Sequence, residues 1–124
     1  MTNEISDIIN TKLLTLSSRV YRNKAKKDEK TPYVVYSLKG NNDTYPSTDY
    51  ILDIKVFEKN DGTVSVRAME KLADDIDSAL NLKTLSSASY LIELQKTLRQ
   101  FEDDTSLVGD QFVNLQYSAR VYAR

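Results

Sequence analysis

Apolar residues change their spacing along the chain, and each change marks an expected element. Two segments repeat an apolar residue every three or four positions, which predicts a helix with one buried face. They comprise Ile5, Ile8, Ile9, Leu13 and Leu16, and then Met69, Leu72, Ala73, Ile76, Ala79 and Leu80. The second helix has a candidate cap in Thr63 or Ser65, but residues 63–66 also fit a strand, which leaves its start open.

Three other segments indicate strands. Residues 33–38 are β-branched or aromatic with apolar side chains on both faces, as in a central strand. Residues 50–58 alternate, with Tyr50, Leu52, Ile54, Val56 and Glu58 on one side and Ile51, Asp53, Lys55 and Phe57 on the other. Residues 113–122 alternate in the same way after a turn at Gly109, which predicts a strand with one wet face.

Residues 90–101 satisfy two patterns at once. Apolar side chains at even positions from Tyr90 to Leu98 fit a strand. A stripe through Leu91, Leu94, Leu98 and Phe101, with helix-favouring neighbours, fits a helix. With a strand here, the order is α-β-β-α-β-β. We then expect a single α+β domain over residues 1–124, a mostly antiparallel four-stranded sheet with two helices packed on one face.

Residues 40–49 have the composition of a long loop, rich in Gly, Asn, Asp, Ser, Thr and Pro. Long loops in small domains often carry function. An aromatic residue in a polar loop can anchor a protein contact, although it can also fold back on its own domain. We therefore select a candidate interaction loop that consists of Asn41, Asn42, Asp43, Tyr45 and Pro46.

The composition of the 124 residues excludes many chemistries. The chain has no His and no Cys, which excludes His- or Cys-based zinc sites, Cys-His or Ser-His nucleophiles, and disulfides. The only glycines, at residues 40, 62 and 109, lie too far apart for a phosphate-binding glycine loop. The net charge is −1, and neither a signal peptide nor a membrane span is evident. We expect a soluble intracellular protein that is not an enzyme and needs no cofactor.

Basic residues concentrate in one connector, between residues 19 and 30. Its weak candidate contact set for phosphates is Arg22, Lys24, Lys26 and Lys27. Asp28 and Glu29 interrupt the run, and a solvated connector explains it better.

Acidic residues gather in two places. Residues 102–104 together with Asp110 resemble a hard-cation site but lack calcium-loop spacing, so hydrated turn carboxylates are expected instead. Asp74, Asp75 and Asp77 lie away from the apolar stripe of the second helix, and we expect them on a solvated face.

Four segments in order carry a resemblance to a known family. They are residues 31–36 (TPYVVY), 50–57 (YILDIKVF), 68–76 (AMEKLADDI) and 117–122 (YSARVY). The chain resembles the small tail completion, or tail terminator, proteins of long-tailed bacteriophages and prophages, also described as tail-to-head joining proteins. The resemblance implies an α+β fold in which residues 90–101 form a strand, and it carries no catalytic residues.

The same resemblance implies partners and a location. It implies a ring of copies of this chain, with six subunits, that caps the tail tube and meets the head-tail connector or head-closure protein. DNA would pass through the ring without specific binding, and no membrane is involved. The location would be the virion neck, after assembly in the bacterial cytoplasm. The alternatives are another neck component, such as a head-closure or connector adaptor, and a small nucleic-acid-binding regulator that uses residues 19–30.

Overall fold

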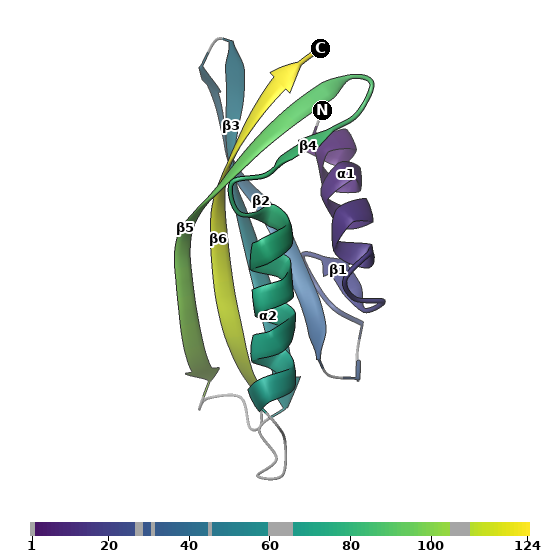
Figure 1. Ribbon diagram of the computed structural model, residues 1–124, viewed down its shortest axis with the longest axis vertical. Helices are drawn as coiled ribbons and strands as arrows, with labels where there is room; N and C mark the ends of the chain where they lie inside the picture. The colour runs from purple at the N-terminus through teal and green to yellow at the C-terminus, as the bar shows by residue number, and fades with distance from the viewer. Residues whose placement is uncertain (1, 27–28, 31, 45, 60–65, 105–109) are drawn as a thin grey trace.

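Two helices and six strands make up the computed structural model, which describes residues 2–26, 29–30, 32–44, 46–59, 66–104 and 110–124. Of the residues named above, Lys27, Asp28, Tyr45, Thr63, Ser65 and Gly109 lie outside these ranges. The elements, labelled in Figure 1, are α1 (Thr2–Leu14), β1 (Val20–Arg22), β2 (Tyr33–Thr44), β3 (Ser47–Lys59), α2 (Val66–Leu80), β4 (Thr84–Ser86), β5 (Tyr90–Asp104) and β6 (Asp110–Ala123).

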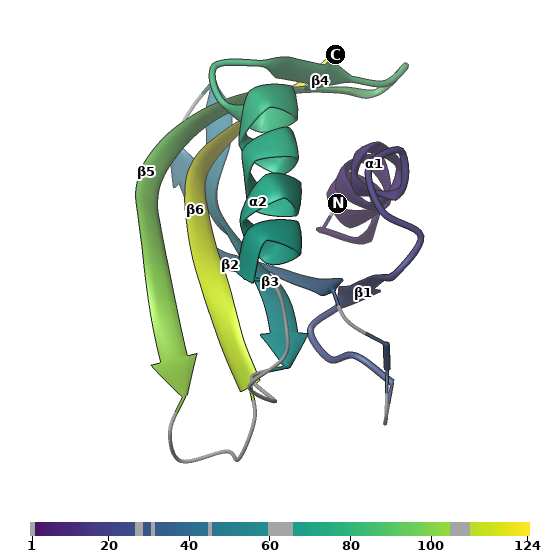
Figure 2. The ribbon, with the colours of Figure 1, turned by 60° about the horizontal axis from the view of Figure 1, so that its bottom comes forward.

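All six strands join one mixed sheet in the order β1-β2-β3-β6-β5-β4. The long strands pair antiparallel, whereas β1 pairs parallel to β2. The sheet bends around the helices into a half-barrel (Figure 2). The expected four-stranded, mostly antiparallel sheet in the order α-β-β-α-β-β is therefore wrong.

The two additional strands are three residues long and lie at opposite edges of the sheet. β1 aligns Val20 with Val34 and Arg22 with Tyr36, and β4 aligns Leu85 with Ile92. Three residues cannot show a period, and each strand depends on a long neighbour for its hydrogen bonds. Tertiary pairing, which local sequence does not encode, therefore creates both of them.

The segment expected to be a loop is a hairpin instead. β2 runs to Thr44 and β3 begins at Ser47, with backbone pairing from Asn42–Asp49 to Thr44–Ser47. A register shift between Lys39 and Asn42 interrupts the pairing, and Gly40 has a φ of 65° there. Glycine adopts this left-handed conformation without strain, so the turn-forming composition produces a bulge within a strand pair.

Residues 90–101 are a strand, as the family resemblance implied. β5 pairs with β6 along its length, from Tyr90–Ala123 to Asp104–Asp110. A register shift between Lys96 and Leu98 reverses the alternation of side chains, and this shift is what gives the segment its mixed pattern.

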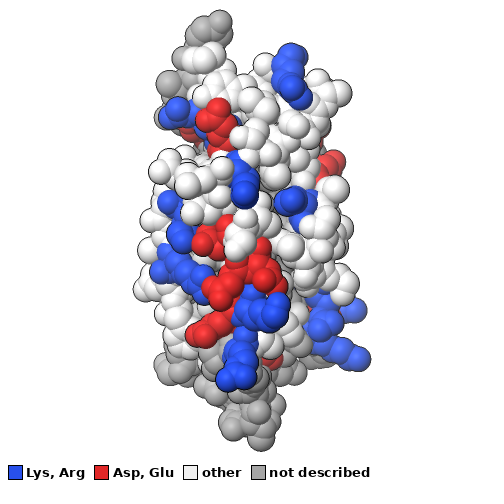
Figure 3. Space-filling model, in the orientation of Figure 1, with Lys and Arg blue, Asp and Glu red and all other residues white. Residues whose placement is uncertain are grey.

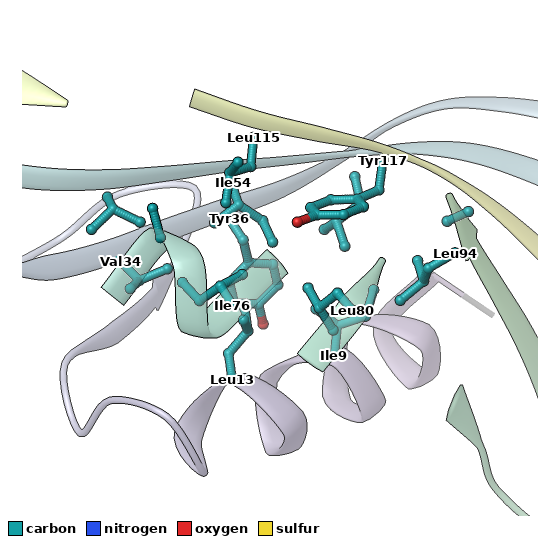
Figure 4. Close-up of a cluster of buried hydrophobic side chains, with 14 of the residues drawn as sticks. Ile9, Leu13, Val34, Tyr36, Ile54, Ile76, Leu80, Leu94, Leu115 and Tyr117 are labelled. Carbon is teal, nitrogen blue, oxygen red and sulfur yellow. The ribbon is translucent and has the colours of Figure 1, made fainter. Parts of the chain in front are cut away.

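Both helices cover the same face of the sheet, which we call the inner face (Figures 1 and 2). The opposite face is the outer face. One cluster of buried apolar side chains fills the space between helices and inner face, including Ile9, Ile54, Ile76 and Leu115 (Figure 4). Buried Tyr36 adds a polar tie to α1, where its hydroxyl lies 3.1 Å from Ser6 Oγ. Neither described helix therefore covers the outer face.

Asp77 departs from the expectation of a solvated helix face. It lies one turn after Ala73 and one turn before Leu80, at the border of the buried stripe of α2. Its carboxylate accepts hydrogen bonds from the buried Tyr117 hydroxyl and from Lys96 Nζ, both at 2.8 Å. The carboxylate thus ties α2 to β6 and to β5 beside the bulge.

The other two aspartates of this group follow the expectation. Asp74 and Asp75 are exposed, and they form surface ion pairs with Arg99 at 2.6 Å and with Lys71 at 3.2 Å. Across the described residues, no helix is long and apolar enough to cross a membrane.

Candidate interaction surface

The outer face of the sheet carries a row of aromatic rings at one end. The register places Tyr33, Phe57 and Phe112 next to one another on β2, β3 and β6. The first two rings stack with centroids 5.0 Å apart, and Phe57 and Phe112 are tilted with centroids 5.2 Å apart. Lys55 Nζ lies 5.2 Å from the centre of the Phe112 ring, within the range of a cation–π contact. This end of the outer face is therefore apolar and ordered, with a positive charge over it.

The basic connector is anchored at both of its described ends. Asn23 has a φ of 68°, and the amide of Lys24 donates to the carbonyl of Arg22 at 2.8 Å, which makes a tight turn after β1. Further along, the carboxylate of Glu29 is buried and accepts a hydrogen bond from the Tyr21 hydroxyl. Glu29 Oε1 also accepts a hydrogen bond from the backbone amide of Lys30 at 2.7 Å. The connector is thus tied to the fold by a buried acid.

The turn at Asn23 brings the connector to the outer face, where it forms one wall of a groove of about 490 Å³. We call this the lysine groove. Its lining residues are Asn23, Lys24, Ala25, Lys26, Tyr33, Val35, Tyr36, Ser37, Lys39, Asp53, Lys55 and Phe57. Two lysines come from the connector and one each from β2 and β3, and Asp53 is the one acid in the lining. Glu29, outside the lining, lies 4.0 Å from Lys26 Nζ, so the four lysines still outnumber the carboxylates near them.

Asp53 is the unusual member of the lysine groove, because only 5% of its surface is exposed. One carboxylate oxygen accepts a hydrogen bond from Lys39 Nζ at 3.3 Å. The other, Oδ1, finds no hydrogen-bond donor in the described part of the chain. Asn114 Oδ1, also on the outer face, is buried and unpaired in the same sense. A buried acceptor without a donor costs free energy, so these two oxygens are suited to receive donors from outside the chain.

The helical side of the molecule has a different charge pattern. Acidic side chains gather over α2, with lysine and arginine side chains beside them (Figure 3). Several of these charges are already paired within the chain, Asp74 with Arg99 and Lys71 with Asp75 among them. The unpaired, buried carboxylate oxygen of the outer face has no counterpart among the described acids of this side.

The residues selected from the sequence separate into three groups. Lys24 and Lys26 lie together on the lysine groove, whereas Arg22 is on β1 and donates to Asn3 Oδ1 at 2.9 Å. The backbone of residues 41–43 belongs to β2, and Pro46 is exposed at the hairpin turn. Lys27 and Tyr45 are outside the described residues. The structure therefore joins only part of the basic set into one surface.

The described side chains can be compared with the metal and carboxylate sites considered above. Among them, no group of three or more His, Cys, Asp or Glu residues could hold a metal ion. The hydrogen bonds of Asp77 include one from Tyr117, whose pKa is raised by burial and by the hydrogen bond to Asp77. Residues 102–104 and Asp110 belong to β5 and β6 by their backbone, and their side chains are outside the description.

Solved structures with the same fold exist, although sequence comparison finds no relative. No model of a protein family matches the chain, and no curated protein matches it significantly. A chain from the virion of a native gene transfer agent particle superimposes with a TM-score of 0.62 at 17% identity, covering 89% of this chain and 84% of that one. A second protein, without a descriptive name, superimposes with a TM-score of 0.61 at 14% identity over 94% of both chains. At these identities the likeness shows a shared fold.

Three charged residues of the lysine groove were not selected from the sequence: Lys39, Asp53 and Lys55. The alternation in residues 50–58 already put Asp53 and Lys55 on the polar side of their strand, together with Phe57. The pattern could not predict that the connector lies against that side of the strand after a turn at Asn23. An acid, a lysine and an aromatic residue on one strand face were the signal that could have found the site.

Proposed function

We propose that the protein is a structural component of a phage or phage-like particle that caps the tail tube as a ring. The ring ends polymerisation of the tube and forms the tail side of the head-tail junction. The observation that carries the proposal is the fold shared with a chain of a gene transfer agent virion, a phage-like particle, over most of both chains. The order of the four family-like segments from residue 31 to residue 122 supports the more specific tail role.

In this proposal the protein works by contact and not by turnover. Its partners are further copies of itself, the tube protein and the connector or head-closure protein, and DNA passes through the ring without specific binding. The location is the virion neck. An outer face with an aromatic row, a lysine groove and buried unpaired acceptors is suited to protein contacts.

The test is electron microscopy of particles made without the gene. We expect tubes of unregulated length, or tails without heads, and restoration of normal tails by the gene supplied from a plasmid. Tails of normal length joined to heads in the absence of the protein would reject the role.

A second neck role rests on the same fold match, because the gene transfer agent virion is named as a whole and no component of it is specified. The chain would then be a head-closure or connector adaptor. The purified protein distinguishes the two roles: a tail cap binds tube subunits, whereas an adaptor binds the portal complex.

A further inference from the structure

We propose that the lysine groove receives the tip of β5 from a second copy of this chain. We define the β5 tip as residues 99–104, which are strand by their backbone. This inference rests on the proposed ring, because it names the contact by which copies would join.

The groove and the β5 tip lie at opposite edges of the sheet. The groove is built on β2, β3 and the connector after β1, at the first edge of the strand order. At the other edge, β4 pairs with β5 only from Leu91 to Glu93. The backbone amide of Lys96 donates to Asn81 Oδ1. Beyond Lys96, no described strand or side chain forms backbone hydrogen bonds with the edge of β5 that faces away from β6. A contact between opposite edges is head-to-tail, the kind of contact that builds rings.

The two surfaces also lie at the same level along the strands. Register pairs connect Val34 to Val56, Val56 to Val113, and Val113 to Phe101 in one row across the sheet. The groove residues Tyr33 and Val35 flank this row at one edge, and the β5 tip continues it at the other. A neighbour placed by rotation alone, without a shift along the strands, brings tip to groove. A head-to-tail contact without such a shift has no rise to build a helical filament, and it forms a ring where its rotation closes.

The chemistry of the tip matches that of the groove. Phe101 is 48% exposed and can add to the aromatic and apolar wall of Phe57 and Val35. The strand backbone continues through residues 102–104, which are all acidic in the sequence, so the tip is negative in composition where the groove is positive. An open strand edge also presents main-chain N–H groups, which are the donors that Asp53 Oδ1 lacks.

Asp53 also argues against DNA as the occupant of the groove. A DNA backbone presents phosphates, which are acceptors with negative charge. Such a ligand would satisfy the lysines but would bring its charge to a buried carboxylate with an unpaired oxygen. A polypeptide edge supplies carboxylates and N–H donors together, and it therefore suits both halves of the site.

Cysteine cross-linking tests the contact without background, because the natural chain has no cysteine. One variant carries Ala25→Cys in the groove, and another carries Gln100→Cys beside Phe101 on the exposed part of β5. The matched control is Gln95→Cys, an exposed glutamine on the same strand and nearer its start. Mild oxidation of a mixture of the Ala25→Cys and Gln100→Cys variants should give disulfide-linked dimers and no larger disulfide-linked species.

The mixed pair should cross-link about tenfold or more faster than Ala25→Cys with the Gln95→Cys control, because docking raises the local thiol concentration. A chain with both Ala25→Cys and Gln100→Cys should give a ladder of products that ends at one closed species. Equal rates for Gln100→Cys and Gln95→Cys would overturn the proposal.

Charge reversal then assigns the contact to the lysines. Lys24→Glu with Lys26→Glu, added to the Ala25→Cys chain, should slow cross-linking about tenfold, because like charges would face each other. The control reverses two lysines elsewhere, the half-buried Lys12 and the exposed Lys83, and should leave the rate unchanged. Slowing by both pairs alike would contradict a specific groove.

The outcomes separate this contact from the proposed function. Specific cross-linking together with normal tails in particles lacking the gene would leave the contact in place and remove the neck role. Defective tails without specific cross-linking would do the reverse. Retention on duplex DNA that is lost in the Lys24→Glu, Lys26→Glu chain, without cross-linking, would assign the groove to nucleic acid instead.

Discussion

The two faces of the sheet are made by the same strands, yet they differ in what they contain. On β3, the inner-face residues Leu52, Ile54 and Val56 are fully buried and belong to the core. On the outer face of the same strand, Ile51 is 47% exposed and Asp53 is buried with an unpaired oxygen. Because apolar burial drives folding, the inner face carries most of the stability. Folding does not require the outer face and the connector beside it to hold an acid, four lysines and a ring stack together, and in the proposed function this composition serves contacts with other molecules.

The largest difference between the faces should appear when one isoleucine of β3 is shortened at a time. Ile54→Ala removes a fully buried side chain from the core and should lower the free energy of unfolding by about 2–5 kcal/mol. The matched change Ile51→Ala, on the outer face, should cost less than about 1 kcal/mol because half of that side chain is already in water. Urea denaturation of both variants measures the difference, and equal losses would contradict the assignment of the core.

The next effect concerns the polar tie between α2 and the inner face. Tyr117→Phe keeps the buried ring but removes the hydroxyl that donates to Asp77 at 2.8 Å. A hydrogen bond to a charged group contributes about 1.5–3 kcal/mol, so the unfolding free energy should fall by that amount. Tyr122→Phe, on the same strand at a partly exposed position, is the control and should change little. A stable Tyr117→Phe protein would mean that Asp77 is held by Lys96 alone.

Local pattern predicted the long elements well, because each has enough residues to show its period. The alternation from Tyr50 to Glu58 and the stripe from Met69 to Leu80 fall within β3 and α2. The pattern failed where the answer depends on pairing with distant residues. The short strands β1 and β4 have no period of their own, and the glycine-containing segment at residue 40 forms a bulged hairpin because β3 pairs with it.

The candidate surface was predictable only in its parts. Lys24 and Lys26 were selected from the sequence, but as members of a run that includes Arg22, which instead contacts Asn3. Lys39 and Lys55 enter the groove because β2 and β3 align, which a single strand cannot show. The sequence pattern places Asp77 on a solvated helix face, whereas in the fold it accepts hydrogen bonds from Tyr117 and Lys96, which lie far from it in the sequence. The sequence shows which side chains are available, whereas the pairing of strands and helices decides which of them come into contact.

The outer face should respond in the opposite direction when its buried acid is replaced. Asp53→Val exchanges a carboxylate with one unpaired oxygen for a β-branched side chain suited to a strand. Replacing a buried charge by an apolar group is often neutral or stabilising, so we expect the unfolding free energy to stay the same or rise by about 1 kcal/mol. The same variant should weaken the cross-link between Ala25→Cys and Gln100→Cys. A large loss of stability would show that Asp53 serves folding, as the inner-face residues do.

The smallest effect is a change in the free energy of unfolding at acidic pH, and it concerns Asp77, which hydrogen-bonds to the inner face. Burial acts to raise the pKa of Asp77, but hydrogen bonds from Lys96 and Tyr117 and the charge of Lys96 outweigh it, so its pKa is lowered in the folded protein. The unfolded state then binds the proton more readily, and the stability from this carboxylate is present near neutral pH and lost as the pH falls from about 5 toward 2.

Asp77→Asn has no proton to bind at this position, so its unfolding free energy should fall less steeply over the same pH interval than that of the natural chain. Tyr117→Phe removes one of the two hydrogen bonds that lower the pKa and should give an intermediate slope. Urea denaturation at a series of pH values measures all three slopes. Identical slopes for the natural chain and Asp77→Asn would mean that the carboxylate titrates alike in the folded and unfolded states, and that the tie to α2 does not depend on its charge.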